Sequence, residues 1–463
     1  MKRLSVQEII KAVDGILLFG NERDVVENIS TDSRTIESDD MFFAITGDIF
    51  DGHDYIENVV NKGCKAIVVS SSEKLTESIK DINIILVSDT LKAYQDLAKY
   101  YRQLIDPIVI GVTGSVGKTS LKDMLYVISN DYYNTVCSFE NENNHMGVPK
   151  TIFRMEENTE VLILEMGMNH KGEIRRLTEI GRPNIAGITN VGLSHIENFI
   201  DQNGIYEAKM EISDFFSEKN TLVVMGDDQY LKKTHKDKDY EVISVGTSQE
   251  NDYVAEGARY IDDTHITFLI DYDKGVERFT LPIAGLYNST TAGLATAIMS
   301  KLNISVSNCA HSLKKLKITP HRLQLIVRGN IKIIDDTYNA SPASMTSAIE
   351  YLSAIQGSRK ICVLADMKEL GGKSVRLHRE LGHEISKVDI DYLFTVGELG
   401  REIAESAKKN MNENKIFSFE DIASCTEMIK KIIKEGDGIL VKGSHSMGME
   451  KVVSELVKYL SEI

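Results

Sequence analysis

A stretch about a quarter of the way along the chain combines glycine, lysine and hydroxyl side chains, the residue types that bind phosphate. The apolar run at residues 108–112 predicts a buried strand, and a turn of glycine and serine follows it. Gly117, Lys118 and Thr119 then open a segment whose apolar residues have helical spacing. Backbone N–H groups and the helix dipole converge at such a turn and attract an anion. Lys118 would add a charge for the β- and γ-phosphates, and the Thr119 hydroxyl would be a Mg²⁺ ligand.

The glycine positions in this stretch differ from those of the usual phosphate-loop motif. The first glycine of the usual pattern would fall on Val112, but glycines stand at positions 111 and 114 instead. The alternative is an ordinary strand, turn and helix that contains Gly-Lys-Thr by coincidence. Because a strand precedes the motif and a helix follows it, as the motif requires, we expect a site for nucleotide phosphates.

Length and composition restrict the class of protein. A chain of 463 residues exceeds one hydrophobic core, so two or three domains are expected. Hydrophobic residues make up 42% and charged residues 26%, as in a soluble globular protein. The formal net charge of −16 gives no electrostatic basis for binding a polyphosphate backbone, so no nucleic-acid partner is expected.

The five cysteines and the N-terminal residues indicate a compartment. The cysteines are scattered and show neither metal-ligand spacing nor a disulfide framework, which is typical of reduced residues in a cytoplasmic protein. The first residues lack the apolar core of a signal peptide, and no apolar run reaches the length of a membrane span. We therefore expect a cytoplasmic protein without a membrane span.

Strand and helix patterns divide the chain into three α/β units at residues 1–104, 105–320 and 321–463. In the second unit the strands alternate with helices, which predicts a parallel sheet covered on both faces. Pro107 and Pro320 mark the boundaries of that unit. The predicted strands are at residues 65–70, 82–88, 108–112, 161–167, 185–192, 221–226, 331–336, 360–367, 392–397 and 438–444.

Residues capable of chemistry follow three successive strands of the second unit: Glu165, His195, and the pair Asp227 and Asp228. In open α/β sheets the ligand crevice lies at the carboxyl ends of the strands, so this recurrence favours a single site. A carboxylate that ends an apolar strand is costly to bury unless it is paired or bound to a metal. This favours Mg²⁺ ligation by Glu165 over a solvated charge.

Three candidates also have ordinary interpretations. A single histidine such as His195 is more often structural than a ligand. Lys209 lies in the helix-like stretch at residues 205–212, where a solvated lysine that pairs with glutamate is the simpler alternative. The segment Asp-Ser-Arg at residues 32–34 is consistent with a turn that carries a surface salt bridge. The residues alone leave these alternatives open.

Taken in order, the motifs resemble those of the Mur ligases, the ATP-dependent amino-acid and peptide ligases of cell-wall precursor synthesis. The resemblance covers essentially the whole chain. The spelling TGSVGKT at residues 113–119 is similar to the family's form of the phosphate loop, which accounts for the displaced glycine. Four further blocks resemble the family's motifs and follow its order; they are at residues 139–149, 164–177, 188–199 and 207–212.

Three blocks of the last unit resemble the branch of the family that adds D-alanyl-D-alanine. They are DDTYNASPASM at residues 335–345, ADMKELG at 365–371 and LVKGSHSMGMEKVV at 440–453, and the first is the most specific. The stretch at residues 32–56 is similar to the N-terminal domain shared by the two last-acting members. The resemblance implies a central phosphate-loop ATPase domain between an N-terminal domain for the UDP-substrate and a C-terminal Rossmann-like domain. The last domain would close over ATP on a hinge near residues 320–323.

The resemblance also implies roles for individual residues. Thr119 and Glu165 would hold one Mg²⁺. His195 would hold a second together with Lys209, after carboxylation of that lysine by CO₂. The catalytic residues would be Lys118, Lys209 and His195. The UDP-substrate and the dipeptide would be contacted by Ser33, Arg34, Asn339 and Ser341. The residues expected to bind ATP are Thr113, Gly114, Ser115, Val116, Gly117, Lys118, Thr119, Ser120, Asn144, Asn288, Arg322 and Asp336.

At four positions the chain departs from the family's usual residues. Tyr287 stands where a histidine is usual, and Thr291 where a second asparagine is common. Ala365 replaces a glycine, and His445 replaces an arginine. A neutral histidine is a weaker partner for the dipeptide carboxylate than a bidentate arginine.

The implied reaction joins D-alanyl-D-alanine to UDP-N-acetylmuramoyl-tripeptide through an acyl phosphate, with ATP as the phosphoryl donor. It would give the pentapeptide precursor of peptidoglycan, and we expect a monomer. Two alternatives stay open from the sequence: a Mur ligase that adds the third amino acid, and a phosphate-loop ATPase that acts as a switch or scaffold.

Overall fold

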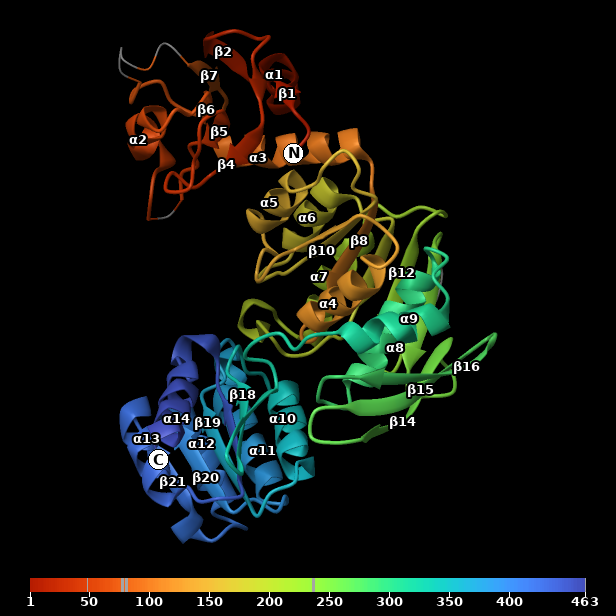
Figure 1. Cartoon of the computed structure of the whole chain (residues 1–463), viewed down its shortest axis with the longest axis vertical. Coiled ribbons are helices and arrows are strands. Elements are labelled where there is room, and N and C mark those ends of the chain that lie inside the picture. Colours follow the sequence, from red (N-terminus) through yellow and green to blue (C-terminus); the bar gives the residue numbers. More distant parts are fainter. Residues whose placement is uncertain (48, 76–78, 80–81, 235–237, 463) are drawn as a thin grey trace.

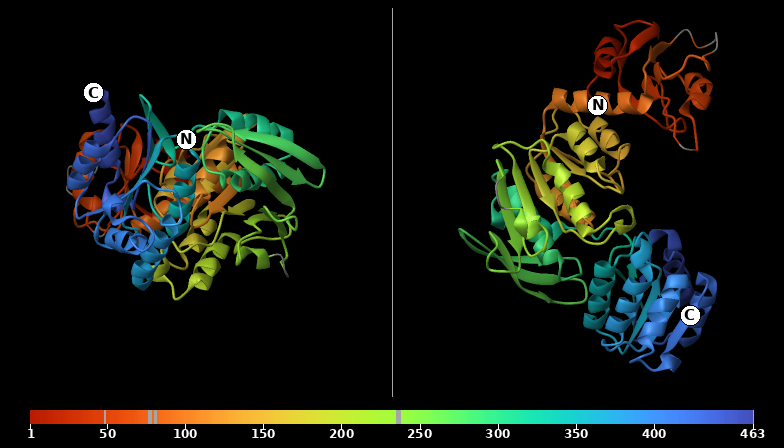
Figure 2. Two further views of the ribbon diagram at one scale, coloured as in Figure 1. Left: turned by 90° about the horizontal axis from the view of Figure 1, so that it is seen from below. Right: turned by 180° about the vertical axis from the view of Figure 1, so that it is seen from behind.

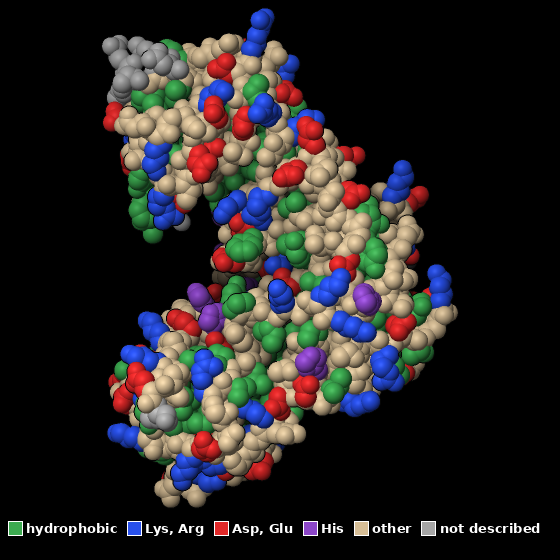
Figure 3. Space-filling model, viewed as in Figure 1, with side chains coloured by type: hydrophobic (Ala, Val, Ile, Leu, Met, Phe, Trp, Pro, Cys, Tyr) green, Lys and Arg blue, Asp and Glu red, His purple; other side chains and the backbone are tan. Residues whose placement is uncertain are grey.

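Three large β-sheets, one in each of three lobes, organise the chain in this computed structural model. It describes every residue except 48, 76–78, 80, 81, 235–237 and 463. The N-terminal, central and C-terminal lobes follow one another along the sequence (Figure 1), and the view from behind shows the same order (Figure 2). The surface is hollowed between the two end lobes (Figure 3). The predicted fold class of three α/β units around a central parallel sheet is confirmed, while the exact domain boundaries stay a prediction.

The N-terminal lobe contains a five-stranded sheet in the order β2-β7-β6-β5-β4. Its first helix begins at a capping box: the Glu8 N–H donates to Ser5 Oγ at 3.2 Å, and the Ser5 N–H donates to Glu8 Oε2 at 2.8 Å. Strands β6 and β7 match the predictions, and the sequence analysis missed the other strands of this sheet. The elements are β1 (Leu4–Ser5), α1 (Val6–Val13), β2 (Ile16–Phe19), β3 (Val25–Val26), β4 (Asn28–Ser30), β5 (Asp40–Phe43), α2 (Ile56–Asn61), β6 (Ala66–Val69) and β7 (Asn83–Leu86).

Helix α3 (Thr90–Ile105) lies between the N-terminal and central lobes (Figure 1). Its Leu97 and Tyr101 side chains are fully buried. The Tyr101 hydroxyl accepts from the Lys2 N–H at 2.6 Å and donates to the Met155 carbonyl at 2.7 Å. One buried hydroxyl therefore joins the start of the chain, α3 and the central lobe.

The central lobe contains a nine-stranded sheet in the order β16-β15-β14-β13-β12-β11-β8-β10-β9. Strands β8 to β14 pair in parallel, as predicted for this unit. The strands are β8 (Ile108–Thr113), β9 (Thr135–Cys137), β10 (Val161–Glu165), β11 (Ile185–Ile188), β12 (Thr221–Met225), β13 (Glu241–Gly246), β14 (Tyr253–Tyr260), β15 (Ile266–Tyr272) and β16 (Gly275–Leu281). The helices are α4 (Lys118–Ser129), α5 (Gly147–Phe153), α6 (Glu173–Gly181), α7 (Gln202–Met210), α8 (Asn288–Ser300) and α9 (Val306–Ser312).

Both faces of the parallel part of this sheet are covered. In β10, Leu162 and Leu164 belong to one buried apolar cluster, while Val161 and Ile163 belong to another. The second cluster includes residues of α4, α8 and α9, and the first includes residues of α5, α6 and α7. Burial on both faces explains why these strands are continuous apolar runs without alternation.

The far edge of the central sheet is antiparallel, which the sequence analysis did not predict. Strands β14, β15 and β16 form a meander that projects from the parallel part (Figure 1). Gly275, with φ of +140°, follows the tight turn between β15 and β16. The alternating pattern ITFLIDY in β15 and the Asp-Lys-Gly turn after it were the available signals.

The C-terminal lobe contains a six-stranded sheet in the order β17-β18-β22-β19-β20-β21. The four predicted strands correspond to β18, β19, β20 and β22, and they pair in parallel with one another. The sequence analysis missed β21 and the antiparallel edge strand β17. The elements are β17 (Gln324–Arg328), β18 (Ile331–Asp336), α10 (Pro342–Ala354), β19 (Arg359–Ala365), α11 (Ser374–Ile385), β20 (Tyr392–Val396), α12 (Glu398–Ala407), β21 (Ile416–Phe419), α13 (Ile422–Ile432), β22 (Asp437–Lys442) and α14 (Glu450–Glu462).

Two expectations from composition can be compared with the structure. All five cysteines are unpaired thiols, and four of them are buried. Across the described residues, no helix combines the length and apolar character needed to cross a bilayer.

We predict that Tyr101→Phe destabilises the junction between the first two lobes by about 2 kcal/mol, because a buried carbonyl and an N–H group lose their partner. Urea unfolding, followed by tyrosine fluorescence, should show an earlier midpoint. Tyr132→Phe is the matched control: Tyr132 is 43% exposed, and its hydroxyl makes no hydrogen bond within the described part of the chain. Equal midpoints for the two variants would contradict the prediction.

Candidate functional site

The predicted phosphate loop connects β8 to α4 at the carboxyl edge of the central sheet. Gly114 and Gly117 have φ of +150° and +86°, which favours glycine at both positions. A Cβ atom on Gly114 would lie 1.8 Å from Thr189 Oγ1. Gly117 is the residue before the first turn of α4, so the helix N-terminus with Lys118 and Thr119 opens at the end of the loop. This is the geometry of a phosphate site.

Two residues after β11 hold the loop, and the sequence analysis did not single them out. The Val116 N–H donates to Asn190 Oδ1 at 3.0 Å, and Asn190 Nδ2 donates to the Val116 carbonyl at 2.9 Å. The Ser115 N–H donates to the Asn190 carbonyl at 3.1 Å, and Thr189 Oγ1 donates to the Val116 carbonyl at 2.5 Å. The position of the loop therefore depends on the neighbouring strand. The only available signal was the Thr-Asn pair inside the block at 188–199.

Thr119 and Glu165 lie together, as predicted. Glu165 pairs with Val112 in the sheet register, so β10 ends beside the loop. Thr119 Oγ1 donates to Glu165 Oε2 at 3.0 Å, and Asn143 Nδ2 donates to Glu165 Oε1 at 2.9 Å. Arg322 Nη2 donates to Thr119 Oγ1 at 3.0 Å, so a residue outside the central sheet reaches the loop. Glu165 is 2% exposed and has partners for both oxygens.

One lysine lies near this carboxylate, and a second lysine lies near the first. Lys118 Nζ donates to the Gly114 carbonyl at 2.9 Å. Burial lowers the pKa of Lys118, while the Glu165 charge raises it. Lys209, on α7, is 3% exposed, and burial together with the Lys118 charge holds its pKa well below the usual range. Within the described part of the chain, the structure shows no hydrogen bond or ion pair for Lys209 Nζ. The surface-lysine alternative for Lys209 is therefore wrong.

His195 contacts the C-terminal lobe. Its backbone has φ of +61°, and its Nδ1 lies 2.8 Å from Glu369 Oε2. The hydrogen bond from His195 lowers the pKa of Glu369. The acidic pair after β12 has structural partners: the Val191 N–H donates to Asp228, and the Thr247 N–H donates to Asp227. The structure thus places Glu165 beside the phosphate loop and His195 against Glu369, and it gives the two aspartates loop-stabilising contacts. A single site that contains both Glu165 and His195 stays a prediction.

The Asn144 side chain stabilises the turn that leads into α5. Its Oδ1 accepts from the N–H groups of Met146 and Gly147, at 3.0 and 2.9 Å, at the start of α5. The preceding residue, Asn143, is the one that contacts Glu165. An Asn-Asn pair has no sequence signal that tells which side chain faces the site. Nucleotide binding by Asn144 stays a prediction.

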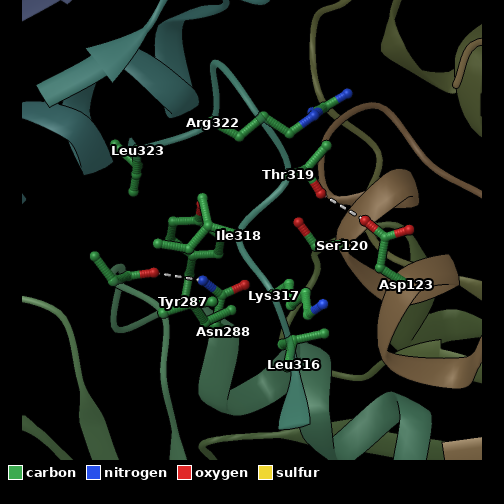
Figure 4. A pocket seen from close by; sticks show the side chains of 12 residues that line it. Ser120, Asp123, Tyr287, Asn288, Leu316, Lys317, Ile318, Thr319, Arg322 and Leu323 are labelled. Atoms are coloured by element: carbon green, nitrogen blue, oxygen red, sulfur yellow. Dashed lines mark hydrogen bonds between the residues drawn. The ribbon is translucent and has the colours of Figure 1, made fainter. Parts of the chain in front are cut away.

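A small cavity of about 40 Å³ lies between α4, α8 and the linker that follows α9 (Figure 4). Asn288 Nδ2 donates to the Ala284 carbonyl at 2.6 Å, and its Oδ1 is buried without a hydrogen-bond partner among the described residues. Thr319 of the linker donates to Asp123 of α4 at 2.6 Å (Figure 4). Ser120 and Tyr287 also line the cavity. An unpartnered acceptor beside the phosphate loop is suited to an amine of a nucleotide base.

Asp336, at the end of β18, is engaged within its own lobe. Its Oδ2 accepts from Lys442 Nζ at 2.5 Å, and its Oδ1 accepts from the Leu323 N–H at 3.1 Å. Lys442 is 2% exposed and also donates to the Asn339 carbonyl at 2.8 Å. A ribose contact from Asp336 stays a prediction.

The predicted substrate residues have local contacts. Arg34 pairs with Asp32 through two hydrogen bonds, of 2.9 and 2.7 Å, and these bonds hold the pKa of Asp32 at about 2. The Ser33 carbonyl accepts from Lys62 Nζ at 2.8 Å. The structure thus shows the turn and surface salt bridge considered above. Ser341 caps α10, and Asn339 Oδ1 accepts from the next N–H group. Substrate contacts of these residues stay predictions.

Comparison with known proteins identifies the family. Three of its profiles match, "Mur ligase family, catalytic domain" at residues 25–102, "Mur ligase middle domain" at 112–299 and "Mur ligase, glutamate ligase domain" at 321–445. The chain belongs to the Mur ligase family. The predicted resemblance is confirmed, and this family membership places the phosphate loop in the middle domain.

Individual Mur ligases match over the full length. A UDP-N-acetylmuramoyl-tripeptide–D-alanyl-D-alanine ligase from Bacillus subtilis is 36% identical over 463 residues, 99% of each chain. A crystal structure of MurF from Acinetobacter baumannii is similar with a TM-score of 0.91 and 28% identity, over 99% of each chain. A MurF ligase from Thermotoga maritima, determined in complex with ADP, has a TM-score of 0.84 and 26% identity, over 94% of this chain and 98% of that one.

We predict that Gly114→Ala weakens ADP binding at least about tenfold in calorimetry. The new methyl group would displace the Thr189 hydroxyl, which anchors the Val116 carbonyl, and the loop would move. Gly172→Ala is the control, because Gly172 also has a positive φ, of +93°, but its Cβ would meet open space. The prediction would be wrong if both variants bound ADP like the parent protein.

Proposed function

We propose that this Mur ligase joins D-alanyl-D-alanine to UDP-N-acetylmuramoyl-tripeptide in an ATP-dependent reaction and produces the pentapeptide precursor of peptidoglycan. The observation that carries the proposal is the match to the Bacillus subtilis ligase of that name over 99% of both chains. The phosphate loop, with Lys118 and Thr119 at a helix N-terminus, supplies the site that such a reaction needs. The proposal also includes action in the cytoplasm and action as a monomer.

The reaction has two steps. A carboxylate oxygen of the tripeptide attacks the γ-phosphorus of ATP, which forms an acyl phosphate and releases ADP. The amine of D-alanyl-D-alanine then attacks the acyl carbon, a C–N bond forms, the C–O bond to phosphate breaks, and the amine loses a proton. Phosphorylation is required because a carboxylate has no adequate leaving group.

Two anions meet in the first step, so the site must supply positive charge. Lys118 donates to the Gly114 carbonyl of the loop and Arg322 donates to Thr119, so both cations lie at the N-terminus of α4. The backbone N–H groups of the loop add donors that need no reorganisation during the reaction. Lys118 carries the largest role, because its flexible stem brings a full charge to the transferred phosphoryl group.

The residues present fit one Mg²⁺. Thr119 Oγ1 and Glu165 Oε2, which lie 3.0 Å apart, are the hard oxygen donors that this ion prefers, and phosphate oxygens of ATP would complete its shell. When bound, the ion would offset negative charge on the phosphates. Among the described residues, no group of three or more His, Cys, Asp or Glu side chains is arranged as a complete metal site. A site made by protein and ATP together is consistent with that finding.

We further propose that Lys209 is carboxylated and that it holds a second Mg²⁺ together with His195. The support is the state of the amine: burial and the Lys118 charge both favour its neutral form, which is the form that reacts with CO₂. As a carbamate, Lys209 would be an anion beside Lys118, so both charges would gain a partner. His195 would have to exchange Glu369 for the ion.

We predict that the wild-type protein releases phosphate from ATP only when UDP-N-acetylmuramoyl-tripeptide and D-alanyl-D-alanine are both present. Lys118→Ala should lower this rate about a hundredfold or more without changing the fold, because the lost charge acts on the transferred phosphoryl group. A coupled phosphate assay and circular dichroism measure the two quantities. Dipeptide-independent hydrolysis would instead favour an ATPase switch, and activity with a free amino acid would favour another Mur ligase.

We predict that protein equilibrated with carbon-13 bicarbonate shows a carbamate carbon signal in NMR spectra, and that Lys209→Ala removes it. The variant should lose most activity, and short-chain carboxylic acids should restore part of it, because they supply the missing anion. Full activity of Lys209→Ala, or a spectrum identical to that of the parent protein, would contradict the carbamate.

A further inference from the structure

Arg322 is held in an unusual way for an arginine at a phosphate site. Its Nη2 donates to Thr119 Oγ1 at 3.0 Å, but its Nε is buried and has no hydrogen-bond partner in the described part of the chain. No ion pair to a carboxylate is found for it among the described residues. The neighbouring His321 and Leu323 both have positive φ, of +61° and +46°, so the backbone is sharply bent there. Neither a salt bridge nor a regular element therefore fixes the guanidinium.

The other contact of this guanidinium is an aromatic face. The Arg322 Cζ atom lies 3.9 Å from the centroid of the Tyr338 ring, within the range of a cation–π interaction. Tyr338 belongs to the block at residues 335–345, just after β18 in the C-terminal lobe. Its own N–H donates to the His321 carbonyl at 3.1 Å, which keeps the ring beside the bend that carries Arg322. The ring is also 6.1 Å from that of His445.

We propose that Tyr338 is a positioning residue for ATP binding: its ring face holds the Arg322 guanidinium against Thr119 of the phosphate loop. The proposal rests on the proposed ligase function. A planar guanidinium stacks on a ring and keeps its edge free to donate hydrogen bonds, so Arg322 can reach Thr119 and a phosphate oxygen while it is stacked. The ring needs no charge, and a carboxylate in its place would neutralise the cation that ATP requires.

This arrangement connects two lobes at the reacting end of the nucleotide. Tyr338 moves with the C-terminal lobe, since its backbone continues from β18, whereas Thr119 belongs to the central lobe. The contact between Arg322 and Thr119 is therefore made only when the two lobes have the relative placement seen here. Loss of the Tyr338 ring should weaken ATP binding through Arg322 and leave the loop itself intact.

The test is a double-mutant cycle on the Michaelis constant for ATP, measured with both acceptor substrates present. Tyr338→Leu should raise this constant about tenfold, equivalent to about 1.4 kcal/mol. Tyr338→Phe keeps the ring and should recover most of the loss. In an Arg322→Ala background, Tyr338→Leu should have almost no further effect, since the residue acts through the arginine. Tyr459→Leu, which removes a remote lysine–tyrosine contact between α13 and α14, is the matched control.

Three results would overturn the proposal: additive effects of Tyr338→Leu and Arg322→Ala, an equal loss in Tyr338→Phe, or no change in Tyr338→Leu. Calorimetry with a non-hydrolysable ATP analogue on the same variants gives the coupling without turnover. If the wild-type protein showed no dipeptide-dependent phosphate release, the ligase function would fail, while the binding cycle would still test Tyr338. Thermal unfolding of each variant checks the fold, which should be kept because Tyr338 is 36% exposed.

Discussion

The buried carboxylate of Glu165 is the constraint on which the site depends, because an ionised group at the end of an apolar strand must have partners. Its two oxygens accept from Thr119 and Asn143, and Lys118 adds a favourable charge nearby. These partners come from two separate segments, so they fix the first turn of α4, which follows the phosphate loop, and the segment before α5 relative to β10. Arg322 then joins through Thr119. Charge compensation thus organises the site before any nucleotide binds.

The parallel sheets could be predicted from the sequence because strands buried on both faces are continuous apolar runs, as in β8 and β10. Strands with one exposed face, or at an edge, gave weaker patterns. The apolar residues of β16, among them the exposed Val276, are interrupted by charged ones, and β17 has a run of only three apolar residues that ends at the half-exposed Val327. The meander of β14 to β16 was missed because the other strands of this unit alternate with helices. Its alternating apolar and polar residues were therefore not taken as successive strands.

The local part of the site was predictable and the long-range part was not. A motif such as residues 113–119 fixes its own turn through glycine positions, and Glu165 follows from strand polarity. Asn190 and Asn143 bind partners that lie 74 and 22 residues away in the sequence. Tyr338 contacts Arg322 through the face of its ring. No local spacing in the sequence encodes such contacts. The sequence analysis named Asn144 and not Asn143, because a sequence does not show which of two adjacent amides contacts Glu165. Only the packing of β10 against the loop decides it.

The linker between the last two lobes has separate attachments to each of them. Thr319 is tied to α4 by its hydrogen bond to Asp123, so it belongs to the central lobe. His321 is tied to the C-terminal lobe, since its Nδ1 lies 2.8 Å from Asp335 Oδ2, and its carbonyl accepts from Tyr338. Pro320 is the one residue between these two attachments. Because proline fixes its own φ, rotation would be concentrated in the bonds on either side of it. Arg322 lies beyond this pivot, so closure of the C-terminal lobe would carry Arg322 and Tyr338 together as one unit.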